Sequence, residues 1–395
     1  MKISQELYER AAKIYPKGVN SPVRYYDPYP LFFKKGMGGE IEDVDGNRYK
    51  DFVLAYGPLI LGHCHPEVIE KIKERVDSGS LLGAPTEEEV EFGEIFKKAS
   101  GLEMMRVVNS GTEATMHAIR LALHHSGRRK VLKVRGGYHG THPYNFPSEL
   151  VQEVEFNDPE AARAMLSSRD FGALILEPVM GNSGVIPPSG GYLEELQEMS
   201  RRYGTPLILD EVITGFRVGF YPYYRTKGIE PDLATFGKIV GGGFPLAVYG
   251  GREELMREVR PEGIFPQAGT YSGNPVSVTA GLVTLKVLSR TDYGKLANLT
   301  RVAASELSRS GLSVNSVTGM LSIFFTDKGV KNHSDVLSTR KDLYFRLFKS
   351  ALENGIYIPP SFDETVFLSF AHSENDVRES FSFLAEEGRK LWRGL

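Results

Sequence analysis

A single lysine stands between an apolar run and three glycines in the stretch "PDLATFGKIVGGGFP". Leu233–Phe236 reads as a strand, Gly237 and Lys238 follow it, and the glycines at 241–243 come almost at once. Taken alone, this pattern is more often a solvated lysine in a flexible loop, because glycine-rich segments usually form turns. The alternative is that the glycines make room for a large group that bonds to the amine.

Two other side chains could do chemistry beside such an amine. Asp210 follows the apolar run "PLIL", so its carboxylate leaves a strand that we expect to be buried. A buried carboxylate needs a partner, and either a protonated ring nitrogen or the start of a helix would serve. Tyr138 in "GGYHG" could stack on a flat heteroaromatic ring, although an isolated tyrosine more often packs in a core.

The stretch "NSGTEA" places Ser110, Gly111 and Thr112 where a strand gives way to a helix. The free N–H groups of a helix start and the two hydroxyls suit a phosphate dianion, whereas a simple N-cap explains the same residues without a ligand. A phosphate site, a stacking ring, a carboxylate and a reactive lysine together predict pyridoxal 5′-phosphate as the cofactor.

These residues are expected to lie together because each follows a strand of one sheet. Apolar runs alternate with helical patterns from about Pro66 to Pro275, which predicts parallel βαβ units in a doubly wound α/β domain. Ligands bind at the carboxyl ends of such strands. The strand candidates are Met105–Val108, Val131–Val134, Ala173–Leu176, Leu207–Leu209 and Leu233–Phe236.

The chain is expected to have three parts. Residues 1–60 form an N-terminal segment, with a helix near residues 5–14 and a hairpin turn at Asp45-Gly46. Residues 61–275 form the large α/β domain. Residues 276–395 form a smaller α+β domain, which opens with a long helix at Val276–Leu288.

Composition excludes several classes of protein. The 395 residues carry a formal net charge of −3 without a basic cluster, which argues against nucleic-acid binding. No apolar run is long enough to span a membrane, so a cytoplasmic protein is expected. Cys64 is the one cysteine, which excludes an internal disulfide and a cysteine-based zinc site. His63 and His65 flank it in "GHCHP", and we expect a structural role for them because no third metal ligand is apparent.

The chain resembles the class III, fold type I pyridoxal-phosphate-dependent aminotransferases, and within them the glutamate-1-semialdehyde 2,1-aminomutases. The shared motifs, spread over nearly the whole chain, include "DVDGNRYKDF", "GPLILGHCHPEV", "NSGTEATMHAIRLA", "EPVMGN" and "LILDEVITGFRVG". "NSPVR" and "AGTYSGNP" point to the aminomutases. The resemblance implies a mostly parallel central sheet with helices on both faces, beside a smaller α+β domain and an N-terminal segment.

The resemblance also implies roles for the cofactor-binding residues. Lys238 corresponds to the lysine that bonds to the cofactor and carries protons, and Asp210 to the partner of the pyridine nitrogen. Tyr138 corresponds to the stacked ring, and Asn182 to a residue near the cofactor's phenolic oxygen. The phosphate cradle corresponds to Ser110, Gly111 and Thr112.

Other implied roles concern the substrate and a second subunit. Ser21 and Arg24 correspond to residues that hold the substrate carboxylate, which a guanidinium can bind through two parallel hydrogen bonds. Glu364 corresponds to an acid in the substrate pocket, although by itself it reads as a solvated surface acid. Gly269 and Thr270 correspond to a pair that reaches the phosphate of the neighbouring subunit, so a homodimer is the expected partner.

The implied reaction converts glutamate-1-semialdehyde, a small amino aldehyde, to 5-aminolevulinate, the precursor of tetrapyrroles (porphyrins). The enzyme would begin with pyridoxamine 5′-phosphate and consume no outside amino donor. The alternative is a class III ω-aminotransferase or amino-acid racemase with the same cofactor, which would need a carboxylate site other than Ser21 and Arg24. A non-catalytic binding module is disfavoured because it would have no chemical need of both Lys238 and Asp210.

One segment departs from the family pattern. After "GGYHGTHPYN" the chain reaches "VEFND" about fifteen to twenty residues sooner than the family does, which is the size of a lid loop. Either the lid is short or a flexible segment is absent from this sequence. We favour an absent segment, with the join near Asn145–Pro147.

Overall fold

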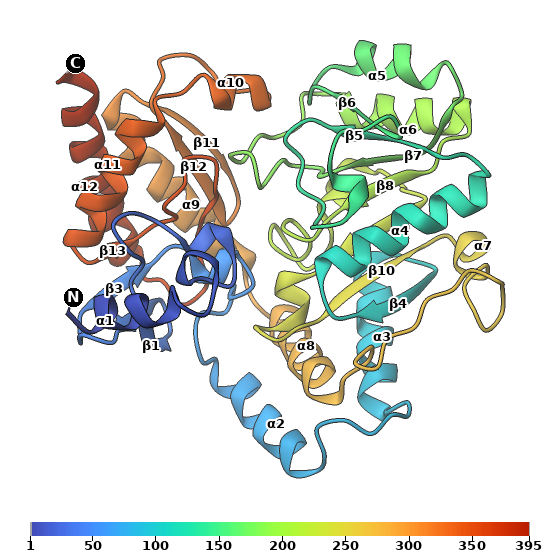
Figure 1. Ribbon diagram of the computed structural model, residues 1–395, viewed down its shortest axis with the longest axis horizontal. Helices are drawn as coiled ribbons and strands as arrows, with labels where there is room; N and C mark the ends of the chain where they lie inside the picture. The colour runs from blue at the N-terminus through green and yellow to red at the C-terminus, as the bar shows by residue number, and fades with distance from the viewer. Residues whose placement is uncertain (1, 395) are drawn as a thin grey trace.

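A sheet of seven strands forms the centre of the computed structural model, which describes residues 2–394 (Figure 1). Its strand order is β4-β10-β9-β8-β7-β5-β6. The strands are β4 (Met104–Val108), β5 (Lys130–Val134), β6 (Val151–Val154), β7 (Phe171–Leu176), β8 (Leu207–Asp210), β9 (Leu233–Phe236) and β10 (Ala247–Gly251). All five strands expected from the sequence are present, with ends that differ by two residues at most.

The sheet is parallel except for one strand. Strands β6, β5, β7, β8 and β9 pair in parallel, whereas β10 runs antiparallel to both of its neighbours, β9 and β4. Strand β4 therefore has the same direction as β9, and the carboxyl ends of six strands meet at one edge. This edge is where the sequence places the candidate residues. Strands β6 and β10 were not expected.

Both faces of the sheet are covered, as the mostly parallel pairing requires. Strand β7 is buried at every position. Its alternate residues enter two different cores, because successive side chains of a strand point to opposite faces. Ala173 and Ile175 pack with helix α4 (Gly111–Ser126) in one core, and Leu174 and Leu176 belong to the larger core on the other face.

The other helices of this part flank the sheet or extend from it (Figure 1). They are α2 (Pro66–Asp77), α3 (Glu87–Ser100), α5 (Pro159–Leu166), α6 (Tyr192–Tyr203), the short α7 (Glu253–Met256) and α8 (Pro275–Leu288). No helix in residues 2–394 combines the length and the apolar character needed to cross a lipid bilayer.

The N-terminal segment and the C-terminal part share a second sheet, ordered β1-β2-β3-β13. The expected hairpin joins β2 (Glu40–Asp43) to β3 (Arg48–Asp51), and β13 (Ile356–Tyr357) pairs with β3 in parallel. The remaining elements of these two parts are α1 (Lys2–Ala11), β1 (Phe33–Met37), α9 (Tyr293–Leu307), β11 (Ser313–Val317), β12 (Met320–Phe324), α10 (His333–Leu337), α11 (Lys341–Glu353), β14 (Val366–Phe367) and α12 (Glu374–Arg393).

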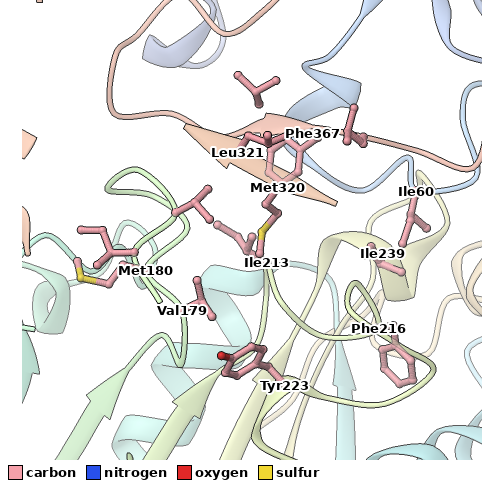
Figure 2. Close-up of a cluster of buried hydrophobic side chains, with 14 of the residues drawn as sticks. Ile60, Val179, Met180, Ile213, Phe216, Tyr223, Ile239, Met320, Leu321 and Phe367 are labelled. Carbon is pink, nitrogen blue, oxygen red and sulfur yellow. The ribbon is translucent and has the colours of Figure 1, made fainter. Parts of the chain in front are cut away.

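A continuous core joins the C-terminal sheet to the large domain. Figure 2 shows Met320 and Phe367, from strands β12 and β14, facing Ile213 of the large domain. Helix α8, which the sequence pattern placed in the C-terminal domain, instead packs against α2 and α3. The three-part division remains a proposal, and these contacts favour a second boundary after Leu288.

Candidate active site

Lys238 lies at the carboxyl end of β9, where the short 3-10 turn Lys238–Gly241 begins. It lines a cavity of about 200 Å³ at the edge of the sheet. Six of the residues predicted from the sequence line this cavity together: Gly111, Thr112, Tyr138, Asn182, Asp210 and Lys238. The interpretation of Lys238 as a solvated loop residue is therefore wrong.

The surroundings of Lys238 favour its reactive form. Burial lowers the pKa of its amine to about 8, although the carboxylates of Glu364, Glu177 and Asp210 oppose this effect. Arg217 is the positive group that adds to the lowering. With a pKa of about 8, roughly one tenth of the amine is unprotonated at pH 7. Such an amine can act as a nucleophile or exchange a proton near neutral pH.

Three donors hold the carboxylate of Asp210 at the end of β8. Its Oδ1 accepts hydrogen bonds from the Thr235 hydroxyl at 3.1 Å and the Val212 N–H at 3.0 Å. Its Oδ2 lies 2.7 Å from Nδ1 of His139, whose Nε2 is buried without a partner. The carboxylate is 3% exposed and is fixed in direction. Sequence reasoning missed His139, although it stands next to Tyr138 in "GGYHG".

The start of helix α4 forms part of the wall of the same cavity. Ser110 is the N-cap, and its Oγ accepts the N–H of Glu113 at 3.2 Å. Gly111 and Thr112 follow it into the cavity lining. A Cβ on Gly140 would lie 2.5 Å from Oγ1 of Thr112, so the two segments approach closely. The N-cap interpretation is confirmed for Ser110, and the first N–H groups of α4 remain available to an anion.

The Tyr138 ring is 46% exposed at the cavity, so it is not part of the core. Its backbone N–H donates to Oε1 of Glu177 at 3.2 Å, and Oε2 of the same carboxyl accepts the Gly181 N–H at 2.9 Å. Burial raises the pKa of Glu177. This carboxyl therefore holds the two loops that present Tyr138 and Asn182.

Glu364 comes from the loop before β14 and reaches the site from the C-terminal part. Burial raises the pKa of its carboxyl to about 7, and the charge of Lys238 partly opposes that rise. Glu364 in turn raises the pKa of Tyr138 and of Tyr56, after the larger effect of burial in each case. Its interpretation as a solvated surface acid is wrong.

The predicted substrate-carboxylate residues lie near this cluster but do not line the cavity. Arg24 is exposed at the end of the turn Pro22–Arg24, and Ser21 is the N-cap of that turn. The Tyr56 hydroxyl donates to the Val23 carbonyl at 2.5 Å. Tyr56, which faces both Arg24 and Glu364, thus connects the turn to the site.

Gly269 and Thr270 lie on an exposed loop outside the cavity lining, next to Tyr271, which is 59% exposed. Their predicted contact with a second subunit remains a prediction.

Gly242 does not clear space for a ligand, which corrects the interpretation that all three glycines after Lys238 make room for a large group. A Cβ on Gly242 would lie 2.3 Å from Oγ1 of Thr284 and 2.7 Å from the Ala280 carbonyl oxygen, both on helix α8. A Cβ on Gly241 would lie 3.4 Å from Leu246, which is an ordinary van der Waals distance. The glycines allow the lysine turn to pack closely on its surroundings.

The structure also places two other sequence features, the histidines of "GHCHP" and the expected join near residue 145. Nε2 of His63 lies 2.7 Å from Oδ2 of Asp51, and no group of His, Cys, Asp and Glu in the described chain is arranged to hold a metal ion. The expected join near Asn145–Pro147 is a continuous short connection into β6, where Nζ of Lys133 donates to the Asn145 carbonyl at 2.9 Å. The absent lid segment remains a prediction.

Comparison with known proteins agrees with this geometry. The model of the aminotransferase class-III family matches residues 22–149 and 142–376, and its two parts overlap at the short connection. A glutamate-1-semialdehyde 2,1-aminomutase of Thermoplasma volcanium is 44% identical, over 95% of this chain and 96% of its own length.

Two solved structures have the same fold. An omega-transaminase from Sphaerobacter thermophilus superposes with a TM-score of 0.92 at 27% identity, over 98% of each chain. A glutamate-1-semialdehyde-aminomutase variant from Pseudomonas aeruginosa PAO1, in complex with PMP, gives a TM-score of 0.89 at 26% identity, over 98% of this chain and 94% of its own. The chain belongs to the class-III aminotransferase family.

Proposed function

We propose that this protein is a pyridoxal-phosphate-dependent isomerase that converts glutamate-1-semialdehyde to 5-aminolevulinate by moving an amino group within one molecule. The full-length similarity to the Thermoplasma volcanium aminomutase supports this reaction. The observation that carries it is the amine of Lys238, whose pKa is lowered by burial, in one cavity with Asp210 and the start of α4.

The residues of the cavity fit pyridoxal 5′-phosphate and its amine form, pyridoxamine 5′-phosphate. Asp210 offers a fixed carboxylate for a protonated ring nitrogen, and the start of α4 offers N–H groups and the Thr112 hydroxyl for a phosphate. The half-exposed ring of Tyr138 is free to stack on a flat ligand, and Asn182 lies in the same lining. When bound, the cofactor supplies an electron sink and carries the amino group between carbons.

Lys238 is the residue that moves protons in this proposal. Because its pKa is about 8, Nζ can both accept and release a proton at neutral pH. Glu364, with a pKa of about 7, faces the same amine and can hold a proton nearby. Asp210 stays oriented throughout because three donors fix it.

Substrate binding and assembly complete the proposal. Ser21 and Arg24 bind the substrate carboxylate, and the contact of Tyr56 with Val23 supports their position beside Glu364. Gly269 and Thr270 complete the phosphate site of a second subunit in a homodimer, which agrees with their exposure here. A cytoplasmic location and a role in porphyrin biosynthesis follow from the proposed reaction.

The test is incubation of the full-length protein with glutamate-1-semialdehyde and no other amine or keto acid. Formation of 5-aminolevulinate supports the proposal. A reaction that requires an added keto acid would instead identify an aminotransferase, such as the omega-transaminase with the same fold. Lys238→Ala should abolish the reaction, whereas Lys286→Ala, which removes an exposed partner of Glu91, should not.

A further inference from the structure

Arg217 is completely buried, yet no carboxylate in residues 2–394 forms an ion pair with it. Its Nε donates to the Ile213 carbonyl at 2.9 Å, and its Nη2 donates to the Gly57 carbonyl at 2.6 Å. Its Nη1 is buried without a partner. The guanidinium carbon lies 4.5 Å from the centre of the Phe367 ring, a cation–π contact. A buried arginine normally has a charged partner. This arrangement therefore lowers the stability of the fold, which suggests that the charge has a function.

Three parts of the chain meet at this guanidinium. Gly57 belongs to the N-terminal segment, Ile213 lines the cavity of Lys238, and Phe367 comes from β14 (Figure 2 shows Ile213 and Phe367). The fit is close, because a Cβ on Gly57 would lie 2.9 Å from Nη2 of Arg217 and 3.0 Å from the Phe367 ring. Arg217 therefore connects all three parts at the side of the site.

The segment that ends at Gly57 is a strained turn. Leu54, Ala55 and Tyr56 have φ values of 48°, 55° and 65°, in the left-handed region that costs a non-glycine residue about 1–2 kcal/mol. The Asp51 carboxylate holds the start of the turn, since its Oδ1 accepts the N–H groups of residues 53 and 54 at 2.8 and 2.9 Å. Nη2 of Arg217 holds its end. The turn presents Tyr56, whose hydroxyl supports the segment that carries Arg24.

Arg217 also contributes its charge. The charged groups that face Lys238 are the carboxylates of Glu364, Glu177 and Asp210 and the guanidinium of Arg217, which is the positive member of this set. Burial lowers the pKa of Arg217 to about 9, so it still carries its charge at pH 7.

We propose that Arg217 is a positioning residue of the lysine site. Its hydrogen bonds fix the Leu54–Gly57 turn against the loop of Ile213, and they hold its unpaired charge beside the cavity that Ile213 and Lys238 line together. The inference deepens the proposed function, because it rests on Lys238 as the reactive amine.

The test compares Arg217→Lys, which keeps the charge, with Arg217→Gln, which keeps an N–H donor and removes the charge. Full-length protein freed of cofactor is treated with acetic anhydride at a series of pH values, and acetylation of Lys238 is followed by mass spectrometry. R217Q should raise the pKa of Lys238 by about one unit, which makes acetylation about tenfold slower at pH 7. R217K should leave this pKa close to that of the unmodified protein.

Amide hydrogen exchange tests the other half of the proposal. Both variants shorten the reach to the Gly57 carbonyl, so amides of residues 54–57 should exchange faster in both. The control is Arg128→Gln, which also removes donors to backbone carbonyls, those of Phe171, Tyr203 and Gly204, but does not face Lys238. It should change neither readout.

Equal Lys238 titrations in folded R217K and R217Q would overturn the electrostatic role, and unchanged exchange at residues 54–57 would overturn the positioning role. Circular dichroism establishes that each variant is folded. The measurements need neither cofactor nor substrate, so a failure of the proposed aminomutase reaction would leave their outcome unaffected.

Discussion

Replacing Gly242 by alanine should destabilise the turn that carries Lys238. Gly242 has a φ of 57°, and a Cβ there would lie 2.3 Å from Oγ1 of Thr284 and 2.7 Å from the Ala280 carbonyl oxygen. The Thr284 hydroxyl could rotate away, but the carbonyl belongs to the backbone of helix α8 and cannot. The turn and the helix must therefore separate.

The expected cost has two parts. The left-handed conformation costs alanine about 1 kcal/mol relative to glycine, and forcing a methyl group into a packed site costs about 1–3 kcal/mol. G242A should thus lower the free energy of unfolding by about 2–4 kcal/mol. Gly127→Ala is a matched control, since Gly127 has a φ of 65° and a Cβ there would meet nothing within 4 Å. It should show the conformational cost of about 1 kcal/mol alone.

The assay is denaturant unfolding of the cofactor-free protein, followed by circular dichroism, for both variants. The difference between them isolates the contact with α8. If G242A loses no more stability than G127A, the packing argument is refuted. A loss seen only after pyridoxal 5′-phosphate is added would support the alternative interpretation of the glycine, as space for a ligand.

Three further predictions concern the charges of the site and the core. Glu364→Gln removes a carboxylate that faces Lys238, so the pKa of Lys238 should fall below about 8 by about one unit in the acetylation assay. His139→Phe removes a donor to the Asp210 carboxylate and should weaken binding of pyridoxal 5′-phosphate about tenfold in a fluorescence titration. Burial lowers the pKa of His372 from 6.5 to about 4. The neutral imidazole therefore contributes its full stabilisation to the folded protein above pH 6.5, and this contribution is lost as the pH falls toward 4. Stability should decrease by about 3 kcal/mol over this range, and His372→Gln should flatten the decrease in denaturant titrations.

Each of these predictions has a contradicting outcome. A rise in the pKa of Lys238 in E364Q would mean that loss of burial outweighs loss of charge. Equal cofactor affinity in H139F and in His125→Phe, which alters an exposed pair with Glu258, would remove the role given to His139. An unchanged pH dependence in H372Q would assign the acid sensitivity to other groups.

The sequence predicted the site well where local pattern and function coincide. Strands β7, β8 and β9 are buried at every position, so they read as continuous apolar runs with clear ends. Parallel strands bring those ends to one edge. Asp210 and Lys238 were therefore expected together before any contact was known.

Features that depend on distant packing could not be read in this way. Strand β10 is as apolar as its neighbours, and nothing in its five residues indicates that it runs antiparallel. Glu364 is partly buried, and its carboxyl faces the charge of Lys238, which is distant in the sequence. Arg217 looks like a surface residue until Gly57 and Phe367 enclose it. A charged residue carries no local sign that it will be buried.

The backbone of Lys238 connects this packing to chemistry. Its φ of 49° lies in the left-handed region, which costs a lysine about 1 kcal/mol or more. Strand β9 fixes the residue on one side, and the contact of Gly242 with α8 fixes the turn on the other. The turn cannot relax without breaking one of these contacts. A relaxed loop would expose the amine and return its pKa toward the ordinary 10.5, so the reactivity of Lys238 depends on residues such as Thr284 that lie outside the cavity lining.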